Sequence, residues 1–124
     1  MIAMRLRRSR IDGDNLRVAA STDRLTGLGN RSHLDAEVLL LAERSPEIVV
    51  LHIDLDHFKP VNDTYGHAVG DRVLQLTADY LTAAATDHDG IAARLGGDEF
   101  VLVLPAIDPR QIEEISTALL GQLH

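Results

Sequence analysis

The sequence predicts one α+β domain, and three observations lead to this prediction. The chain has 124 residues, which is enough for a single domain with a core of its own. Its composition, 45% hydrophobic and 25% charged, matches globular averages. Its local patterns follow each other as helix, helix, strand, helix, hairpin and helix. That order differs from the strict alternation of a doubly wound parallel sheet, so the fold class is α+β.

The first 22 residues are expected to form a tail and a connector rather than part of the domain. Arg5, Arg7, Arg8 and Arg10 make the start basic, and we expect a solvated tail there. Residues 14–22 have the pattern of the end of a helix. The domain is then expected over residues 23–124.

The next two elements have clear boundaries in the sequence. Asn30 is a good N-cap for a helix that runs to about Arg44, and Ser45 and Pro46 end it. Residues 48–55 are apolar and β-branched at nearly every position, which is typical of a strand covered on both faces. We therefore expect a central strand.

The second half of the chain predicts a helix, a hairpin and a last helix. A polar stretch precedes a long amphipathic helix over residues 69–84. Two apolar runs, 91–95 and 100–104, flank a Gly-Gly turn. Asp108 and Gln111 have the spacing of a capping box for the last helix. The positions expected to be buried on the three helices are Leu34, Val38, Leu41 and Ala42; Val69, Val73, Leu76, Thr77, Tyr80 and Ala84; and Ile112, Ile115, Ala118 and Leu119.

Composition excludes several classes of function. The formal net charge is −7, and an acidic chain is a poor ligand for a nucleic-acid backbone. There is no cysteine, so thiolate zinc sites and cysteine nucleophiles are excluded, and a cytoplasmic location is expected. No segment approaches the ~18 apolar residues of a membrane span, so we expect no membrane insertion.

Acidic residues gather at two places that a sheet would bring together. Asp54 and Asp56 end the central strand, where open sheets commonly place ligands. Asp98 and Glu99 lie at the hairpin turn. Converging carboxylates suit Mg²⁺, which would offset the acidic charge near a phosphate. Each pair taken alone also fits an ordinary role, as strand-end acids in water or as a glycine turn. An EF-hand is excluded because Lys59 stands where that loop needs glycine.

Three further side chains could bind a nucleotide. Lys59, the only lysine, could contact a phosphate. Asn62 and Asp71 could read the donors that guanine presents. A surface lysine, a turn residue and a first-turn helix acid are the ordinary alternatives. His52 on the strand is expected to be packed and hydrogen-bonded, and the histidines show no metal-ligand spacing.

Four motifs in order resemble the GGDEF family of diguanylate cyclases. They read DRLTGLGNR over 23–31, DLDHFKPVND over 54–63, YGHAVGD over 65–71 and RLGGDEF over 94–100. The resemblance implies a palm-like fold related to adenylyl cyclases and ferredoxin-like domains, with a mainly antiparallel sheet and helices on its faces. It implies that a homodimer condenses two GTP into cyclic di-GMP and pyrophosphate with Mg²⁺ or Mn²⁺. An upstream sensor domain in a bacterial signalling protein is also implied.

The resemblance assigns roles to residues that match the family motifs. Asp23 to Arg31 would couple the incoming helix to the domain. Asn62 and Asp71 would read guanine. The remaining implied assignments are metal ligation by Asp54, the Leu55 carbonyl, Asp98 and Glu99; catalysis by Lys59, Asp98 and Glu99; and GTP binding by His57, Phe58, Lys59, Asn62, His67, Asp71, Gly96 and Gly97.

The family continues past the last helix with further strands and a helix, whereas this chain stops at His124. We therefore expect the last strands and helix to be missing, which would expose residues 48–55 as an apolar edge prone to association. The alternatives to a cyclase are a non-catalytic GTP-binding or partner-binding module, an inactive fragment, or a palm cyclase that closes one nucleotide on itself.

Overall fold

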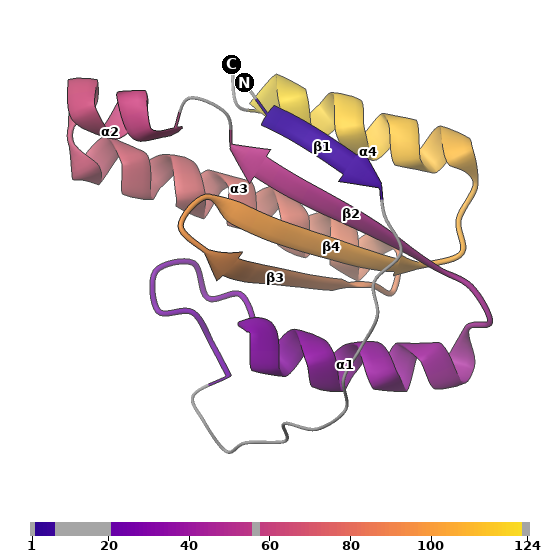
Figure 1. Ribbon diagram of the computed structural model, residues 1–124. Coiled ribbons are helices and arrows are strands. Elements are labelled where there is room, and N and C mark those ends of the chain that lie inside the picture. The colour runs from indigo at the N-terminus through magenta and orange to yellow at the C-terminus, as the bar shows by residue number, and fades with distance from the viewer. Residues whose placement is uncertain (1, 7–20, 56–57, 123–124) are drawn as a thin grey trace.

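The computed structural model describes residues 2–6, 21–55 and 58–122. Within them the strands form one antiparallel sheet in the order β1-β2-β4-β3, and helices pack on both of its faces (Figure 1). The predicted α+β class, with an antiparallel sheet and helices on its faces, is confirmed. The elements are β1 (Ile2–Leu6), α1 (Arg31–Arg44), β2 (Ile48–Leu55), α2 (Phe58–Tyr65), α3 (His67–Asp87), β3 (Ile91–Gly96), β4 (Glu99–Pro105) and α4 (Pro109–Gln122).

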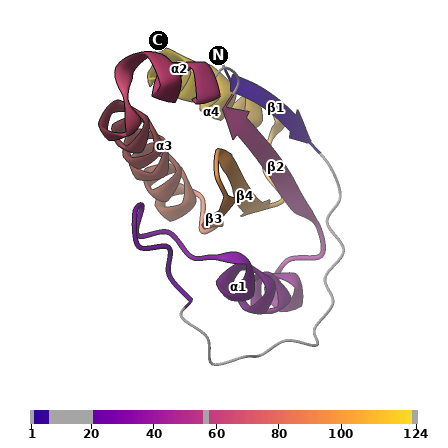
Figure 2. The same ribbon diagram turned by 60° about the vertical axis from the view of Figure 1, so that its left-hand side comes forward.

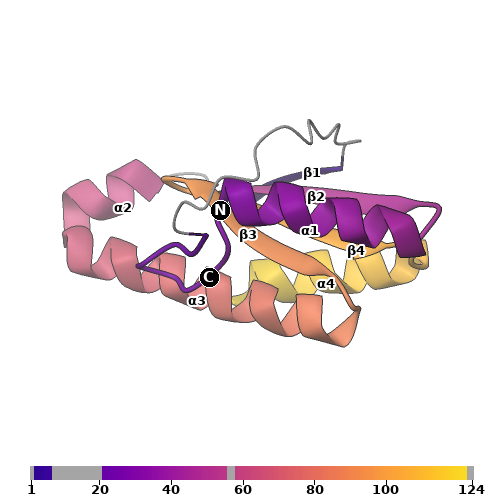
Figure 3. The ribbon, with the colours of Figure 1, turned by 90° about the horizontal axis from the view of Figure 1, so that it is seen from below.

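The two faces of the sheet build two cores. Alternate residues of a strand point to opposite faces, so Leu51, Ile53 and Leu55 pack with α3 and α4, whereas Val50 packs with Val38 of α1. Seen from below, α1 lies on one side of the sheet, and α3 and α4 lie on the other (Figure 3). As predicted, β2 is central and covered on both faces.

The predicted caps of α1 and α4 are confirmed. The Asn30 side chain accepts the backbone N–H of His33 at 3.2 Å. At α4, the Asp108 carboxylate accepts the Arg110 N–H at 2.9 Å, while the Gln111 side chain accepts the Asp108 N–H at 3.2 Å. This reciprocal pair is a capping box, and it sets where α4 begins.

The start of the chain differs from the prediction. Instead of a solvated tail, residues 2–6 form β1, which pairs antiparallel with β2 from Ile2 opposite Leu55 to Leu6 opposite Leu51. Residues 51–55 of the expected apolar edge 48–55 are therefore covered by β1 (Figure 2). Most of the helix expected at 14–22 lies outside the described residues, and Thr22 forms a β-bridge with Gly29 instead. The proposed domain boundary at residue 23 stays a prediction.

No helix was predicted in the polar stretch after β2, but residues 58–65 form α2. Pro60 lies in the first turn of α2, where a missing N–H costs no helical bond. The buried face of α3 differs from the predicted one. Val69 was expected to be buried but is exposed, whereas Gly70, Leu74 and Leu81 are buried. Two small residues expected to be buried, Ala42 of α1 and Ala118 of α4, are exposed.

Candidate functional site

The site is built where β2 ends beside the β3–β4 turn. Asp54 of β2 lies directly opposite Glu99 of β4 in the antiparallel register. Residues opposite each other in such a pair share one face of the sheet, so both acids lie on the face that carries α1. The sequence predicted that these two acids would come together, and the register confirms their proximity.

The turn that carries Asp98 is held against the end of β2. Gly96 pairs with Glu99, and Gly97 between them has a φ of +43°, which favours glycine. The Asp98 carbonyl accepts the Leu55 N–H at 3.2 Å. A Cβ added at Gly96 or Gly97 would meet no atom within 4 Å. The chain's own packing therefore leaves the space beside these glycines open.

Glu99 has a second neighbour that sequence reasoning had not connected to it. His52 lies two residues before Asp54 on the same face, and its Nε2 is 2.9 Å from Glu99 Oε1. His52 is buried, as expected, whereas the Glu99 side chain is 43% exposed. Its pairing with Glu99 could have been found only from the β2–β4 register.

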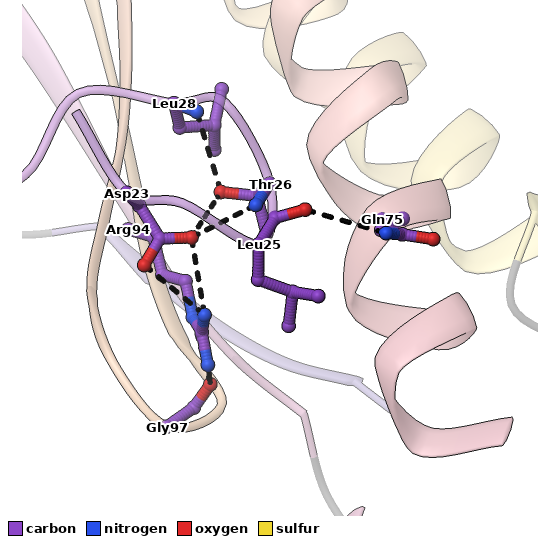
Figure 4. A network of polar contacts seen from close by, with 7 residues as sticks. All are labelled: Asp23, Leu25, Thr26, Leu28, Gln75, Arg94 and Gly97. Carbon is purple, nitrogen blue, oxygen red and sulfur yellow. Dashed lines mark hydrogen bonds and ion pairs between the residues drawn. The ribbon is translucent and has the colours of Figure 1, made fainter. Parts of the chain in front are cut away.

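A polar network joins the hairpin turn to the segment before α1 (Figure 4). Arg94 donates to the Asp23 carboxylate at 3.1 and 3.2 Å, and to the Gly97 carbonyl at 2.8 and 3.1 Å. The Thr26 N–H and hydroxyl donate to Asp23 at 3.0 and 2.7 Å. Gln75 of α3 donates to the Leu25 carbonyl at 3.4 Å. Sequence analysis gave Arg94 no role.

This network shifts the ionisation of Asp23. Partial burial raises the pKa of the Asp23 carboxyl, but the hydrogen bonds from Thr26 and Arg94 and the charge of Arg94 outweigh that effect. The net pKa of Asp23 lies below its ordinary value, so the carboxylate is charged when the pair forms.

The expected guanine-reading residues lie on the α2–α3 corner, at the same end of the sheet as the hairpin turn (Figures 1 and 3). Asn62 is half-buried and Asp71 is exposed. Gly70 packs so closely on Asn62 that an added Cβ would overlap its Oδ1. This Oδ1 is buried and has no hydrogen-bond partner among the described residues.

The other predicted site residues have varied positions. Lys59 and His67 are exposed, and Phe58 is partly buried against the core that α3 and α4 share with the sheet. Asp56 and His57 lie outside the described residues. A cavity of about 490 Å³ is lined by α4 residues such as Arg110 and Glu113, so it is not part of this site.

The implied metal would need oxygen donors that lie close together at this site. In the described part of the chain, no three histidine or acidic side chains are grouped closely enough to hold an ion. Mg²⁺ is commonly held by one or two carboxylates and completed by waters and substrate phosphates. The opposed Asp54 and Glu99, with the turn of Asp98 at the end of β2, fit that smaller requirement.

A family model described as "Diguanylate cyclase, GGDEF domain" matches residues 20–124. The chain belongs to the GGDEF family. The GGDEF fold was therefore correctly predicted from the four motifs. In the described part of the GGDEF chain, no helix is long and apolar enough to cross a bilayer.

One relative of this GGDEF chain is named a diguanylate cyclase, and another is named a cyclic di-GMP phosphodiesterase. It is 41% identical over 97 residues to "Diguanylate cyclase DgcP" of Pseudomonas aeruginosa, covering 75% of this chain and 14% of that one. It is 33% identical over 113 residues to "Cyclic di-GMP phosphodiesterase PdeR" of Escherichia coli, covering 90% of this chain and 17% of that one. The chain thus spans less than a fifth of each relative.

A solved structure has a similar fold. The coiled coil and GGDEF domain of DgcB from Caulobacter crescentus, in complex with c-di-GMP, aligns with a TM-score of 0.70 at 34% identity. The alignment covers 81% of this chain and 54% of that one. The family relationship supports a diguanylate cyclase-type role in general terms.

Proposed function

We propose that the chain supplies one GTP-binding half of a diguanylate cyclase, in which two copies join two GTP into cyclic di-GMP. The observation that carries the proposal is the direct opposition of Asp54 and Glu99 beside the open Gly96-Gly97 turn. A cyclic product made from two identical nucleotides has two-fold symmetry, which a symmetric pair of chains would match. An upstream sensor domain and a cytoplasmic location remain part of the proposal.

The reaction requires the same transfer twice. The 3′-oxygen of one GTP bonds to the α-phosphorus of the other, the bond from that phosphorus to pyrophosphate breaks, and the 3′-hydroxyl loses its proton. When bound, Mg²⁺ or Mn²⁺ would neutralise the phosphate charge. Asp54, Asp98, Glu99 and the Leu55 carbonyl are the groups proposed to hold the ion.

Other side chains would position the nucleotide. Lys59, exposed in the first turn of α2, would place a positive charge on a phosphate. The exposed carboxylate of Asp71 would accept the ring and exocyclic N–H groups of guanine, and the amide of the half-buried Asn62 would supplement it. Glu99, with its exposed carboxylate, would take part in activating the 3′-hydroxyl.

A non-catalytic GTP-binding module is the second candidate. It is favoured by one observation, the relative that is named a phosphodiesterase. Such a module would bind GTP through Asn62 and Asp71 without joining two nucleotides. The two candidates therefore differ in product formation and agree in GTP binding.

The test incubates the chain with GTP and Mg²⁺ and measures pyrophosphate and cyclic di-GMP, together with GTP binding by calorimetry. We expect Asp54→Asn and Glu99→Gln to lower the rate roughly 100-fold or more, whereas Asp79→Asn, an exposed acid on α3, should leave it unchanged. GTP binding without product would favour the non-catalytic module. A chain that neither binds GTP nor forms product would refute both candidates.

A further inference from the structure

His52 is a buried polar side chain in a strand whose other buried residues are all apolar. The neighbouring buried positions of β2 are Val50, Leu51, Ile53 and Leu55. Burying an imidazole without a hydrogen-bond partner is costly compared with burying an aliphatic side chain. The contact that offsets this cost is the 2.9 Å bond to Glu99. Packing alone does not call for histidine at this position.

We propose that His52 is a positioning residue that fixes the Glu99 carboxylate for metal binding and hydroxyl activation. This inference rests on the proposed function, because it names what orients one of its acids. The ring nitrogen Nε2 holds the oxygen Oε1. The other oxygen, Oε2, takes no hydrogen bond from any described residue and belongs to a side chain that is 43% exposed. It is the oxygen left for a ligand.

The strand register explains why Glu99 needs such a partner. Asp54 stands directly opposite Glu99, and His52 stands opposite Val101, so His52 is the diagonal neighbour of Glu99. Like charges placed directly opposite each other destabilise a strand pair, whereas diagonal neighbours lie within reach of long side chains. The donor on the diagonal draws the Glu99 carboxylate along the sheet toward His52, which offsets its repulsion by the directly opposite Asp54.

The hydrogen-bonding chemistry sets the tautomer of the ring. An ionised carboxylate can only accept, so Nε2 must carry the hydrogen. The other nitrogen, Nδ1, is buried and has no hydrogen-bond partner among the described residues. A neutral ring with its hydrogen on Nε2 satisfies its single donor at Glu99 and leaves no donor unpaired at Nδ1.

The test uses two substitutions at His52 and one matched control. His52→Leu removes the donor, whereas His52→Gln keeps an N–H that can reach the same oxygen. Val50→Ala is the control, because Val50 is buried on the same face of β2 but packs against α1. It reproduces a loss of packing without removing a donor from Glu99.

Two measurements are made on the full chain. Ring ¹⁵N spectra at mildly alkaline pH report the tautomer of His52, independently of any activity. Electron paramagnetic resonance with Mn²⁺, in the presence of GTP, reports metal affinity. We expect the Nε2–H tautomer and a roughly 10- to 100-fold weaker Mn²⁺ affinity in His52→Leu. His52→Gln should recover most of that loss, and Val50→Ala should bind Mn²⁺ as the parent does.

Several results would overturn the inference. They are an Nδ1–H tautomer, a His52→Leu variant with the parent's Mn²⁺ affinity, or an equal loss of affinity in Val50→Ala. A parent chain that binds no Mn²⁺ with GTP would refute the proposed function and the role of His52 within it. In that case the tautomer would still report the contact with Glu99 separately.

Discussion

Asp23 and Arg94 form an ion pair between positions 71 residues apart, with nitrogen–oxygen distances of 3.1 and 3.2 Å. The same guanidinium donates to the Gly97 carbonyl in the hairpin turn. Arg94 thus connects the β3–β4 turn by hydrogen bonds to the segment that leads into α1. Both side chains are largely buried, with exposed fractions of 14% for Arg94 and 25% for Asp23, so solvent screens the pair less than a surface ion pair.

We expect Asp23→Asn and Arg94→Gln each to lower the free energy of unfolding by about 1–3 kcal/mol, because hydrogen bonds to charged groups contribute that much. The double variant should lose less than the sum, with a coupling of at least about 0.5 kcal/mol. Urea denaturation of the four chains measures this coupling. Additive losses would mean that the two side chains stabilise the fold independently.

The same pair predicts an acid-sensitive part of the stability. Burial raises the pKa of the Asp23 carboxyl in the folded state, but the hydrogen bonds from Thr26 and Arg94 and the charge of Arg94 outweigh this effect, so the pKa is lowered. The contribution of Asp23 is therefore complete above the unfolded pKa of about 3.9 and is lost as the pH falls through the lower folded value.

Urea midpoints of the parent and Asp23→Asn should differ most near neutral pH, and the difference should shrink as the pH falls below about 4. Asp35→Asn, a half-buried acid on α1, is the control for a general effect of removing a carboxylate. A difference between parent and Asp23→Asn that is the same at every pH would contradict the assignment.

The parts of the fold that could be predicted are those with local signals. Asn30 and Asp108 mark helix starts by their own side-chain chemistry. The apolar run of β2 and the two runs around the glycine turn predict strands, and joining them brings Asp54 opposite Glu99. Local propensity and long-range pairing agree at these positions, so the sequence is informative about this part of the site.

The parts that were missed depend on partners far apart in the sequence. Residues 2–6 form a strand because the edge of β2 is available to pair with them. The four arginines in the first ten residues had instead indicated a solvated tail. The α2 helix contains Pro60, which its first turn tolerates. The bonds of His52 and Arg94 follow from register and turn geometry, which no local pattern encodes.

The pairing of β1 with β2 predicts what its removal would do. Deleting residues 1–6 should leave the hydrogen-bonding edge of β2 unpaired, and exposed apolar edges pair with other chains. We expect the shortened chain to self-associate, as measured by light scattering over a range of concentrations. The full chain carrying Arg5→Ser separates loss of charge from loss of the strand, and it should behave as the parent does. A monomeric shortened chain of unchanged stability would contradict this role of β1.

Gly70 offers a sharp test of the α2–α3 corner. In a helix interior, replacing glycine by alanine normally stabilises by about 1 kcal/mol. Gly121 is the next-to-last residue of α4 and its added Cβ meets no atom within 4 Å, so Gly121→Ala should gain a part of that amount. At Gly70 the Cβ would overlap Asn62 Oδ1, so Gly70→Ala must displace that side chain.

We expect Gly70→Ala to lose the stabilisation that alanine normally brings and to weaken GTP binding about tenfold, since the loss of one hydrogen bond to the base is worth roughly that factor. Calorimetric titration with GTP and urea denaturation of both variants measure the two effects. If Gly70→Ala gains stability as Gly121→Ala does and binds GTP as the parent does, then Asn62 is free to move and its packing against Gly70 does not position it for guanine.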